Sequence, residues 1–158
     1  MYKNNFTFSI PGAKDNILAG TKVLTIRKLP AKVGKELVLR TGSRWIKTGM
    51  PGCLELIFPK GEDPICTGSW PVRINRDSSL AIMESLFFNE ALCYAENAEG
   101  FLHFRYLANA KWSNIEKINF EIIQEFSKMD GWNNSKEMFD FFKNTYGLPF
   151  DGYINYWG

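Results

Sequence analysis

The sequence predicts a β-rich α+β domain, and three observations lead to this fold class. Short runs in which apolar and polar residues alternate, as in half-buried strands, recur along the chain between turns rich in glycine and proline. Two longer segments instead repeat their apolar residues at helical spacing. The chain has no internal repeat or low-complexity segment, and its 158 residues are enough to bury one substantial core. We therefore expect a single domain over residues 1–158.

The first third of the chain predicts a strand, a short helix and a second strand. Residues 5–10 alternate as a strand does and are stopped by Pro11-Gly12. Residues 14–18 then have room for one or two helical turns. Gly20 marks a turn into the second strand, which we place at residues 23–27.

The strand at residues 23–27 carries the most informative side chains. Leu24 and Ile26 point to one of its faces, whereas Thr25 and Arg27 project from the other. Lys22 immediately precedes the strand, and its long side chain can reach over the face that carries Thr25 and Arg27. These three side chains are suited to hold an anion or a nucleobase. The alternative is a half-exposed edge strand with solvated cations.

The next segment predicts three further strands. Residues 36–41 form a short β run that leads into a turn, Thr41-Gly42-Ser43-Arg44, whose polar atoms are candidates to line a pocket. Residues 53–58 and 65–74 also favour strands. The latter is interrupted by Pro71, which predicts a position at a sheet edge because proline cannot donate to a ladder.

The second half of the chain predicts two helices and two strands. Apolar residues recur at helical spacing over residues 80–96, and a strongly amphipathic helix is expected over residues 136–146 with Gly147 as its stop. Alternation over residues 118–122 predicts a strand between them. The ending LPFDGYINYW reads as the last strand.

Composition excludes several classes of protein. The net charge of +2 is too small for an electrostatic grip on long nucleic acid, although basic residues cluster in the first third of the chain. Cys53, Cys66 and Cys93 form no CxxC pair, and no signal-peptide pattern is present, so we expect free thiols in a cytoplasmic protein. A single histidine, His103, argues against multi-histidine metal sites. No apolar run approaches the ~20 residues that a membrane-spanning helix needs.

The order GxKxxTxR at residues 20–27 resembles the opening motif of the ASCH family, which has a PUA-like β-barrel fold associated with RNA. Residues 33–37 resemble that family's turn into its second strand, with Lys35 where an acid is usual. Residues 130–157 are similar to its closing helix and strand. The resemblance implies a PUA-like barrel with flanking helices, and it leaves a family-atypical insertion at about 45–114.

The resemblance also implies a chemistry. In similar ASCH enzymes, bacterial amidohydrolases of N(4)-acetylcytidine, the motif threonine is the nucleophile, the lysine activates it and a glutamate handles protons, without a metal or cofactor. The matching residues are Thr25, Lys22 and Asp130, with Glu99 as the runner-up acid. Aspartate is shorter than glutamate by about 1.5 Å, a deficit that can cost ~100-fold in a positioned reaction. Catalysis by this chain is therefore left open.

A role in binding requires only that these residues contact a ligand, without nucleophilic attack or proton transfer. Arg27, Arg44 and Ser43 are candidates to contact substrate, and Trp132 is placed to stack on a base, a contact worth ~1–3 kcal/mol. The expected partner is a nucleoside, a nucleotide or RNA. A non-catalytic RNA-binding module and a ribonuclease are the alternatives to the amidohydrolase, the last disfavoured because no acids cluster for two metals. The oligomeric state is left open.

Overall fold

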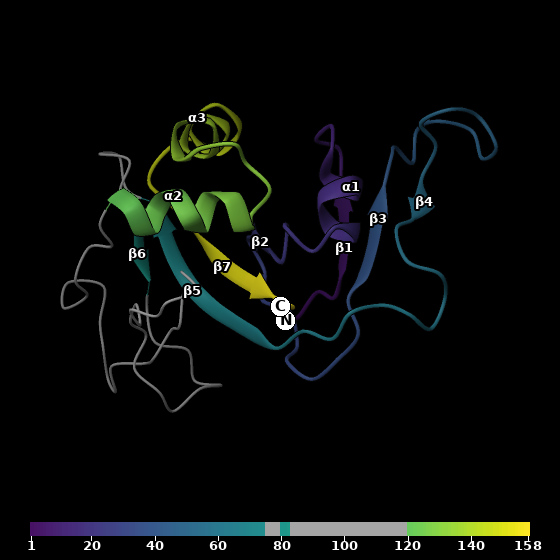
Figure 1. The fold of residues 1–158 in the computed structure, drawn as a ribbon, viewed down its shortest axis with the longest axis horizontal. Helices are drawn as coiled ribbons and strands as arrows, with labels where there is room; N and C mark the ends of the chain where they lie inside the picture. The colour runs from purple at the N-terminus through teal and green to yellow at the C-terminus, as the bar shows by residue number, and fades with distance from the viewer. Residues whose placement is uncertain (75–79, 83–119) are drawn as a thin grey trace.

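The computed structural model describes residues 1–74, 80–82 and 120–158, which form a mixed α+β fold with two sheets (Figure 1). In the first sheet, β1 (Asn5–Phe8) runs parallel to β3 (Val38–Thr41), which pairs antiparallel with β4 (Glu55–Leu56). The second sheet is antiparallel and has the order β2 (Leu24–Arg27), β7 (Phe150–Tyr156), β5 (Gly68–Ile74) and β6 (Leu80–Ile82). The predicted α+β class is confirmed, and the described strands form two sheets without closing a barrel.

Three helices accompany the sheets in the described part of the chain: α1 (Ala13–Leu18), α2 (Phe120–Met129) and α3 (Ser135–Tyr146). In Figure 1, α2 and α3 lie together over the second sheet, whereas α1 lies beside β1 and β3. Among the residues described, no helix is both long and apolar enough to cross a membrane.

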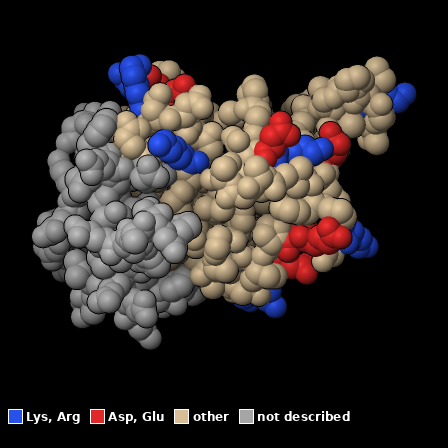
Figure 2. All heavy atoms as spheres, viewed as in Figure 1, with Lys and Arg blue, Asp and Glu red and all other residues tan. Residues whose placement is uncertain are grey.

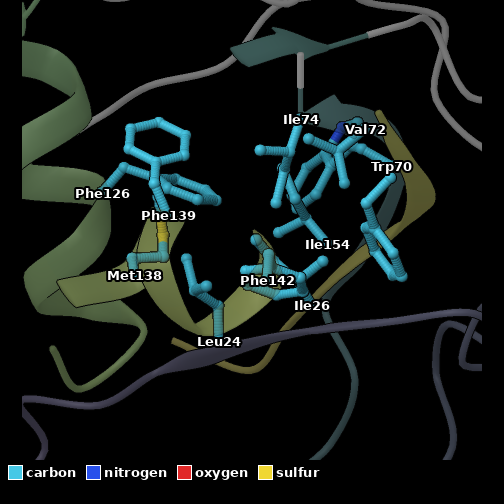
Figure 3. Packing of buried hydrophobic residues seen from close by; sticks show 11 residues of the cluster. Leu24, Ile26, Trp70, Val72, Ile74, Phe126, Met138, Phe139, Phe142 and Ile154 are labelled. Atoms are coloured by element: carbon cyan, nitrogen blue, oxygen red, sulfur yellow. The ribbon is translucent and has the colours of Figure 1, made fainter. Parts of the chain in front are cut away.

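The larger core fills the space between the second sheet and the pair α2 and α3 (Figure 3). Leu24 and Ile26 face into this core from β2, at 1% and 5% exposure, as their alternation predicted. Met138 and Phe142 enter from α3 and lie within one helical turn of each other. The burial of one face of β2 fixes its register, so Thr25 and Arg27 must point away from this core.

A smaller core holds the first sheet and α1 together. Phe6 and Phe8 of β1 pack there with Ile17 of α1 and with Leu37 and Leu39 near β3. The two cores meet where β1 approaches β2, so the face of β2 that carries Thr25 and Arg27 is turned toward β1.

A fully buried amide joins the second sheet to the loop that follows β2. Asn155 of β7 has no exposed surface, and its Oδ1 accepts hydrogen bonds from the Ala31 backbone N–H at 2.7 Å and from Ser69 Oγ at 2.9 Å. Its Nδ2 donates to the Leu29 carbonyl at 3.3 Å. Because a buried amide is costly unless it is paired, these three contacts make Asn155 a central polar anchor of the fold.

Helix α3 begins at Ser135, one residue before the predicted start, and ends at Tyr146 as predicted. The Asn134 side chain accepts from the Glu137 backbone N–H at 2.9 Å and so caps the first turn. Gly147 has a φ of 76°, which glycine adopts without strain, and it stops the helix. The position of this helix fixes Tyr146 and Phe142 at the edge of the pocket described below.

Two sequence predictions about secondary structure are wrong within the described residues. Helix α2 occupies Phe120–Met129, where alternation over residues 118–122 predicted a strand. Leu80–Ile82 is strand β6, paired with residues 72–74 of β5, where the predicted helix was to begin. The remainder of that predicted helix lies outside the described residues.

The expected edge position of Pro71 is also wrong for the strand as a whole. β5 is continuous through Pro71 and lies between β7 and β6. The pairing with β6 covers only residues 72–74, so among the described strands Pro71 has a neighbour on the β7 side alone. A proline is tolerated there because the ladder with β6 does not require its missing N–H.

Candidate functional site

A pocket with a cavity of about 70 Å³ lies where the two cores meet. Its walls come from β1, from β2 together with Lys22, from α3 and from the turn at residues 130–132 between α2 and α3. The structure therefore brings Lys22, Thr25, Arg27, Asp130 and Trp132 into one pocket. Those residues come from two segments that are far apart in the sequence.

A buried ion pair lines this pocket. Lys22 Nζ lies 2.8 Å from Asp130 Oδ1, across 108 residues of sequence, and both side chains are only 6% exposed. The ammonium also donates to the Leu24 carbonyl at 3.0 Å and to the Asp130 carbonyl. Because an ammonium has three N–H groups, these three oxygens satisfy it completely.

Burial lowers the pKa of the Lys22 ammonium below its ordinary value of 10.5. The negative charge and hydrogen bond of Asp130 oppose this effect, and the nearby Arg27 guanidinium adds to it. A buried lysine of this kind is poised to give up a proton more readily than a lysine in water.

The lowered pKa predicts how stability depends on pH. Between the folded-state pKa of Lys22 and 10.5, the unfolded chain binds a proton that the folded chain has lost, so the free energy of unfolding rises with pH. We expect the wild type to gain stability relative to Lys22→Met as pH rises toward 10.5, with the gain complete above that value. Urea unfolding of both proteins from pH 7 to 11 measures this difference. A difference that falls with rising pH would contradict the prediction.

Gly131 allows the lysine to reach the acid. A Cβ at this position would lie 2.9 Å from Lys22 Cδ, and the residue has a φ of +88°. Only glycine adopts this conformation without strain and leaves room for the lysine stem. The turn at residues 130–132 thus places the Asp130 carboxylate against Lys22, and Gly131 leaves room for the lysine side chain.

Trp132 supports the acid from its other side. Its indole Nε1 donates to Asp130 Oδ2 at 2.9 Å, so each oxygen of the carboxylate has a donor. The Trp132 ring lies 5.1 Å from that of Phe141 in α3, measured between centroids. These contacts hold Asp130 in one orientation and give the pocket an aromatic wall.

Thr25 and Arg27 line the same pocket as a hydrogen-bonded pair. Arg27 Nε donates to Thr25 Oγ1 at 3.2 Å, and Nη2 donates to the Thr7 carbonyl of β1 at 3.1 Å. The guanidinium lies over the rings of Phe6 and Phe8, at 5.6 and 5.1 Å from their centroids. Thr25 itself is 4% exposed, so its hydroxyl is shielded from bulk water. Lys22 donates elsewhere and not to this hydroxyl among the contacts of the described residues.

Ser43 and Arg44 do not join this pocket. Ser43 lines a second, neighbouring cavity, and its Oγ accepts from the Trp45 backbone N–H at 3.2 Å. Arg44 is exposed and lies over the Trp45 ring, 5.0 Å from its centroid. The runner-up acid, Glu99, lies outside the described residues.

Residues of β1 and the end of α3 complete the pocket and were not predicted as part of it. The Phe8 ring lies 5.2 Å from Lys22 Nζ as well as beneath Arg27, so one ring contacts both cations. Tyr146, which is 45% exposed, stands at the mouth of the pocket. Alternation in β1 indicated only that Phe6 and Phe8 share a face, and nothing local in the sequence relates them to residues 22–27.

The pocket combines groups suited to binding and to acid–base chemistry. Arg27 offers a planar donor fork, the aromatic side chains offer stacking surfaces, and the Lys22–Asp130 pair lies beside a buried hydroxyl. Within residues 1–74, 80–82 and 120–158, no group of three or more histidine, cysteine, aspartate or glutamate side chains is arranged to hold a metal ion.

Comparison of the chain with protein-family models, with curated proteins and with solved structures gives no match in any of the three. Function is therefore inferred from the geometry of the pocket and from the motif that supplies its side chains. The strand at residues 24–27 and the turn at residues 130–132 line this pocket together with Lys22.

Proposed function

We propose that this protein is an ASCH-like domain whose pocket binds the base of a nucleoside, a nucleotide or an RNA strand. One observation carries the proposal: the residues that resemble the two separate ends of the ASCH pattern, Lys22, Thr25 and Arg27 on one side and Asp130 on the other, line a single pocket. In this proposal the two sheets are parts of a PUA-like barrel with an insertion at about 45–114. Free thiols at Cys53 and Cys66 support a cytoplasmic location.

Arg27 is the group best suited to recognise a base edge. A guanidinium has five N–H donors, of which Thr25 and the Thr7 carbonyl take one each. Among the described residues no carboxylate forms an ion pair with Arg27, so three donors remain for the acceptors of a ligand. The two phenylalanine rings hold the guanidinium in place, which reduces the entropy lost on binding.

The surroundings favour recognition of one base over attraction of a long polyanion. Trp132, Phe141 and Tyr146 give the pocket aromatic walls on which a base can stack. On the face drawn in Figure 2, the described basic and acidic side chains are interspersed on a largely uncharged surface. Because the net charge is only +2, affinity is expected to come from the pocket and not from long-range attraction of a polyanion.

Replacement of Arg27 tests the binding proposal. Arg27→Ala is expected to weaken binding of the preferred ribonucleoside by roughly 10–100-fold, because hydrogen bonds from a charged donor contribute about 1.5–3 kcal/mol. Calorimetric titration with the four ribonucleosides and with N(4)-acetylcytidine measures this change. Arg73→Ala, which removes a partly exposed arginine on β5 outside the pocket, is the matched control. Absence of binding by the wild type, or equal affinities for both variants, would refute the proposal.

Amide hydrolysis on an acylated cytidine is the second candidate function. The observation in its favour is the buried Lys22–Asp130 pair in the same pocket as the buried Thr25 hydroxyl. In this reaction Thr25 Oγ attacks the acyl carbonyl carbon and its proton passes to the Lys22–Asp130 pair. The C–N bond then breaks, and the base leaves with that proton on its nitrogen. Water cleaves the resulting ester, which releases the carboxylic acid and restores the hydroxyl.

Because Lys22 already donates three hydrogen bonds, this reaction requires a proton transfer before Lys22 can act as a base. Its three N–H groups already have partners, so it can accept the threonine proton only after it passes one of its own to Asp130, which lies within hydrogen-bond distance. Lowering of the lysine pKa by burial favours that transfer.

Turnover of N(4)-acetylcytidine separates an enzyme from a binding module. If the protein is a hydrolase, cytidine and acetate form, and Lys22→Ala and Thr25→Ala both abolish product while Thr21→Ala, an exposed neighbouring threonine, does not. Binding without product by the wild type would identify a binding module. Cleavage of a short RNA that depends on the same residues would instead identify a ribonuclease.

A further inference from the structure

A second cavity, of about 420 Å³, adjoins the proposed base pocket. The two share a wall made by Phe8, Ser9, Ile10 and Ala13, at the end of β1 and the start of α1. The far side of the second cavity is the turn after β3, which contributes Ser43. A ligand that fills the first cavity therefore has an adjacent space for any group attached to its base.

Close packing of the backbone builds the far side of this second cavity. A Cβ on Gly42 would overlap the Cys53 carbonyl oxygen, and this glycine has a φ of +93°. The Ser43 backbone N–H donates to the Gly52 carbonyl at 2.9 Å. Residues 42–43 and 52–53 are thus held against each other, which fixes the Ser43 side chain at the cavity.

The lining of the second cavity differs from the aromatic lining of the first. Hydroxyl groups come from Ser9, Thr41 and Ser43, and charged groups come from Lys14 and Asp15 of α1. Neither charged residue forms an ion pair with a described residue. A cation, an anion and hydroxyl groups around one space match a ligand that has both hydroxyl donors and an anionic group.

We infer that the second cavity takes the ribose phosphate of a nucleotide whose base lies in the first. This inference rests on the proposed function and narrows it from a nucleoside to a phosphate-bearing nucleotide, free or within an RNA strand. Ribose hydroxyls donate to the Asp15 carboxylate, and the phosphate accepts from Lys14 and from the hydroxyl of Ser43. Ser9 lines both cavities, so a ligand that lies across this residue reaches from one cavity to the other.

Paired titrations test this inference. The wild type is titrated with the four ribonucleosides, with their 3′- and 5′-monophosphates and with a short single-stranded RNA. We expect the preferred nucleotide to bind at least tenfold more tightly than its nucleoside. Lys14→Ala is expected to remove most of that advantage without changing nucleoside affinity, whereas Lys60→Ala, an exposed lysine outside both cavities, leaves the advantage intact.

A second variant tests the same inference if Lys14→Ala does not fold. Ser43→Leu fills the cavity from its far side, where the phosphate is placed, so it should weaken nucleotide binding more than nucleoside binding. Tighter binding of RNA than of any mononucleotide would identify the source of the phosphate as a strand, and the reverse as a free nucleotide. Equal affinities for nucleoside and nucleotide would overturn the inference and leave the proposed function standing. Absence of binding by every nucleoside and nucleotide would overturn both.

Discussion

Asp130→Asn is expected to lower the free energy of unfolding by about 3 kcal/mol, since it leaves a buried ammonium without its counter-charge. Lys22 cannot retreat to water, because its side chain is 6% exposed and surrounded by β2 and the turn at residues 130–132. Its backbone acceptors at Leu24 and Asp130 survive the substitution, which places the loss at the lower end of the range for broken buried ion pairs. Urea unfolding monitored by circular dichroism measures it.

A double-mutant cycle shows whether the loss comes from the ion pair. The variant that combines Lys22→Met with Asp130→Asn removes both charges, so it should be more stable than Asp130→Asn alone. Asp140→Asn is the matched control, because Asp140 pairs with Lys136 on the exposed face of α3 and is expected to change stability by less than about 1 kcal/mol. Losses that simply add in the double variant would show that the two residues do not interact.

Asn155→Leu is expected to lower the free energy of unfolding by about 3 kcal/mol, because several buried polar groups lose their hydrogen-bond partners at once. The Ala31 N–H and the Leu29 carbonyl would each lose a bond, as would the Ser69 hydroxyl. An unsatisfied buried donor or acceptor costs about 1–3 kcal/mol, and leucine returns part of this through apolar contact. Thermal unfolding should show a fall in Tm of roughly 6–12 °C for a chain of this size.

Asn144→Leu provides the comparison for that measurement. Asn144 lies on the exposed side of α3, where leucine is a better helix former than asparagine, so its variant should keep or slightly raise the wild-type Tm. If both leucine variants unfold at the wild-type temperature, the buried amide network does not stabilise the fold as proposed.

The face of β2 that lines the pocket was predictable because it depends on local geometry. Alternation alone placed Leu24 and Ile26 in the core and Thr25 and Arg27 on the other face, as observed. The contact between Lys22 and Asp130 could not come from periodicity, because the two residues are 108 positions apart. It followed from the resemblance of both segments to one family pattern, and the ion pair shows that these segments do meet.

The strand prediction at residues 118–122 was wrong because it rested on only five residues. Five residues from 118 to 122 alternate, but residues 120–129 taken together space their apolar side chains at three and four positions, which is the helical period. The aromatic platform beneath Arg27 could not be found in this way. Phe6 and Phe8 reach the guanidinium only because β1 and β2, which share no sheet, come together around the pocket.

The place of β7 in the second sheet has a consequence for how the protein is made. β7 lies between β2 and β5, so among the described strands the one that carries Thr25 and Arg27 has no partner in its sheet until residues 150–156 are present. During translation, residues 1–149 are therefore synthesised before β2 can pair within its sheet. Assembly of the pocket therefore depends on β7, and until β7 is made the N-terminal segment has an unpaired strand edge that chaperones are suited to cover.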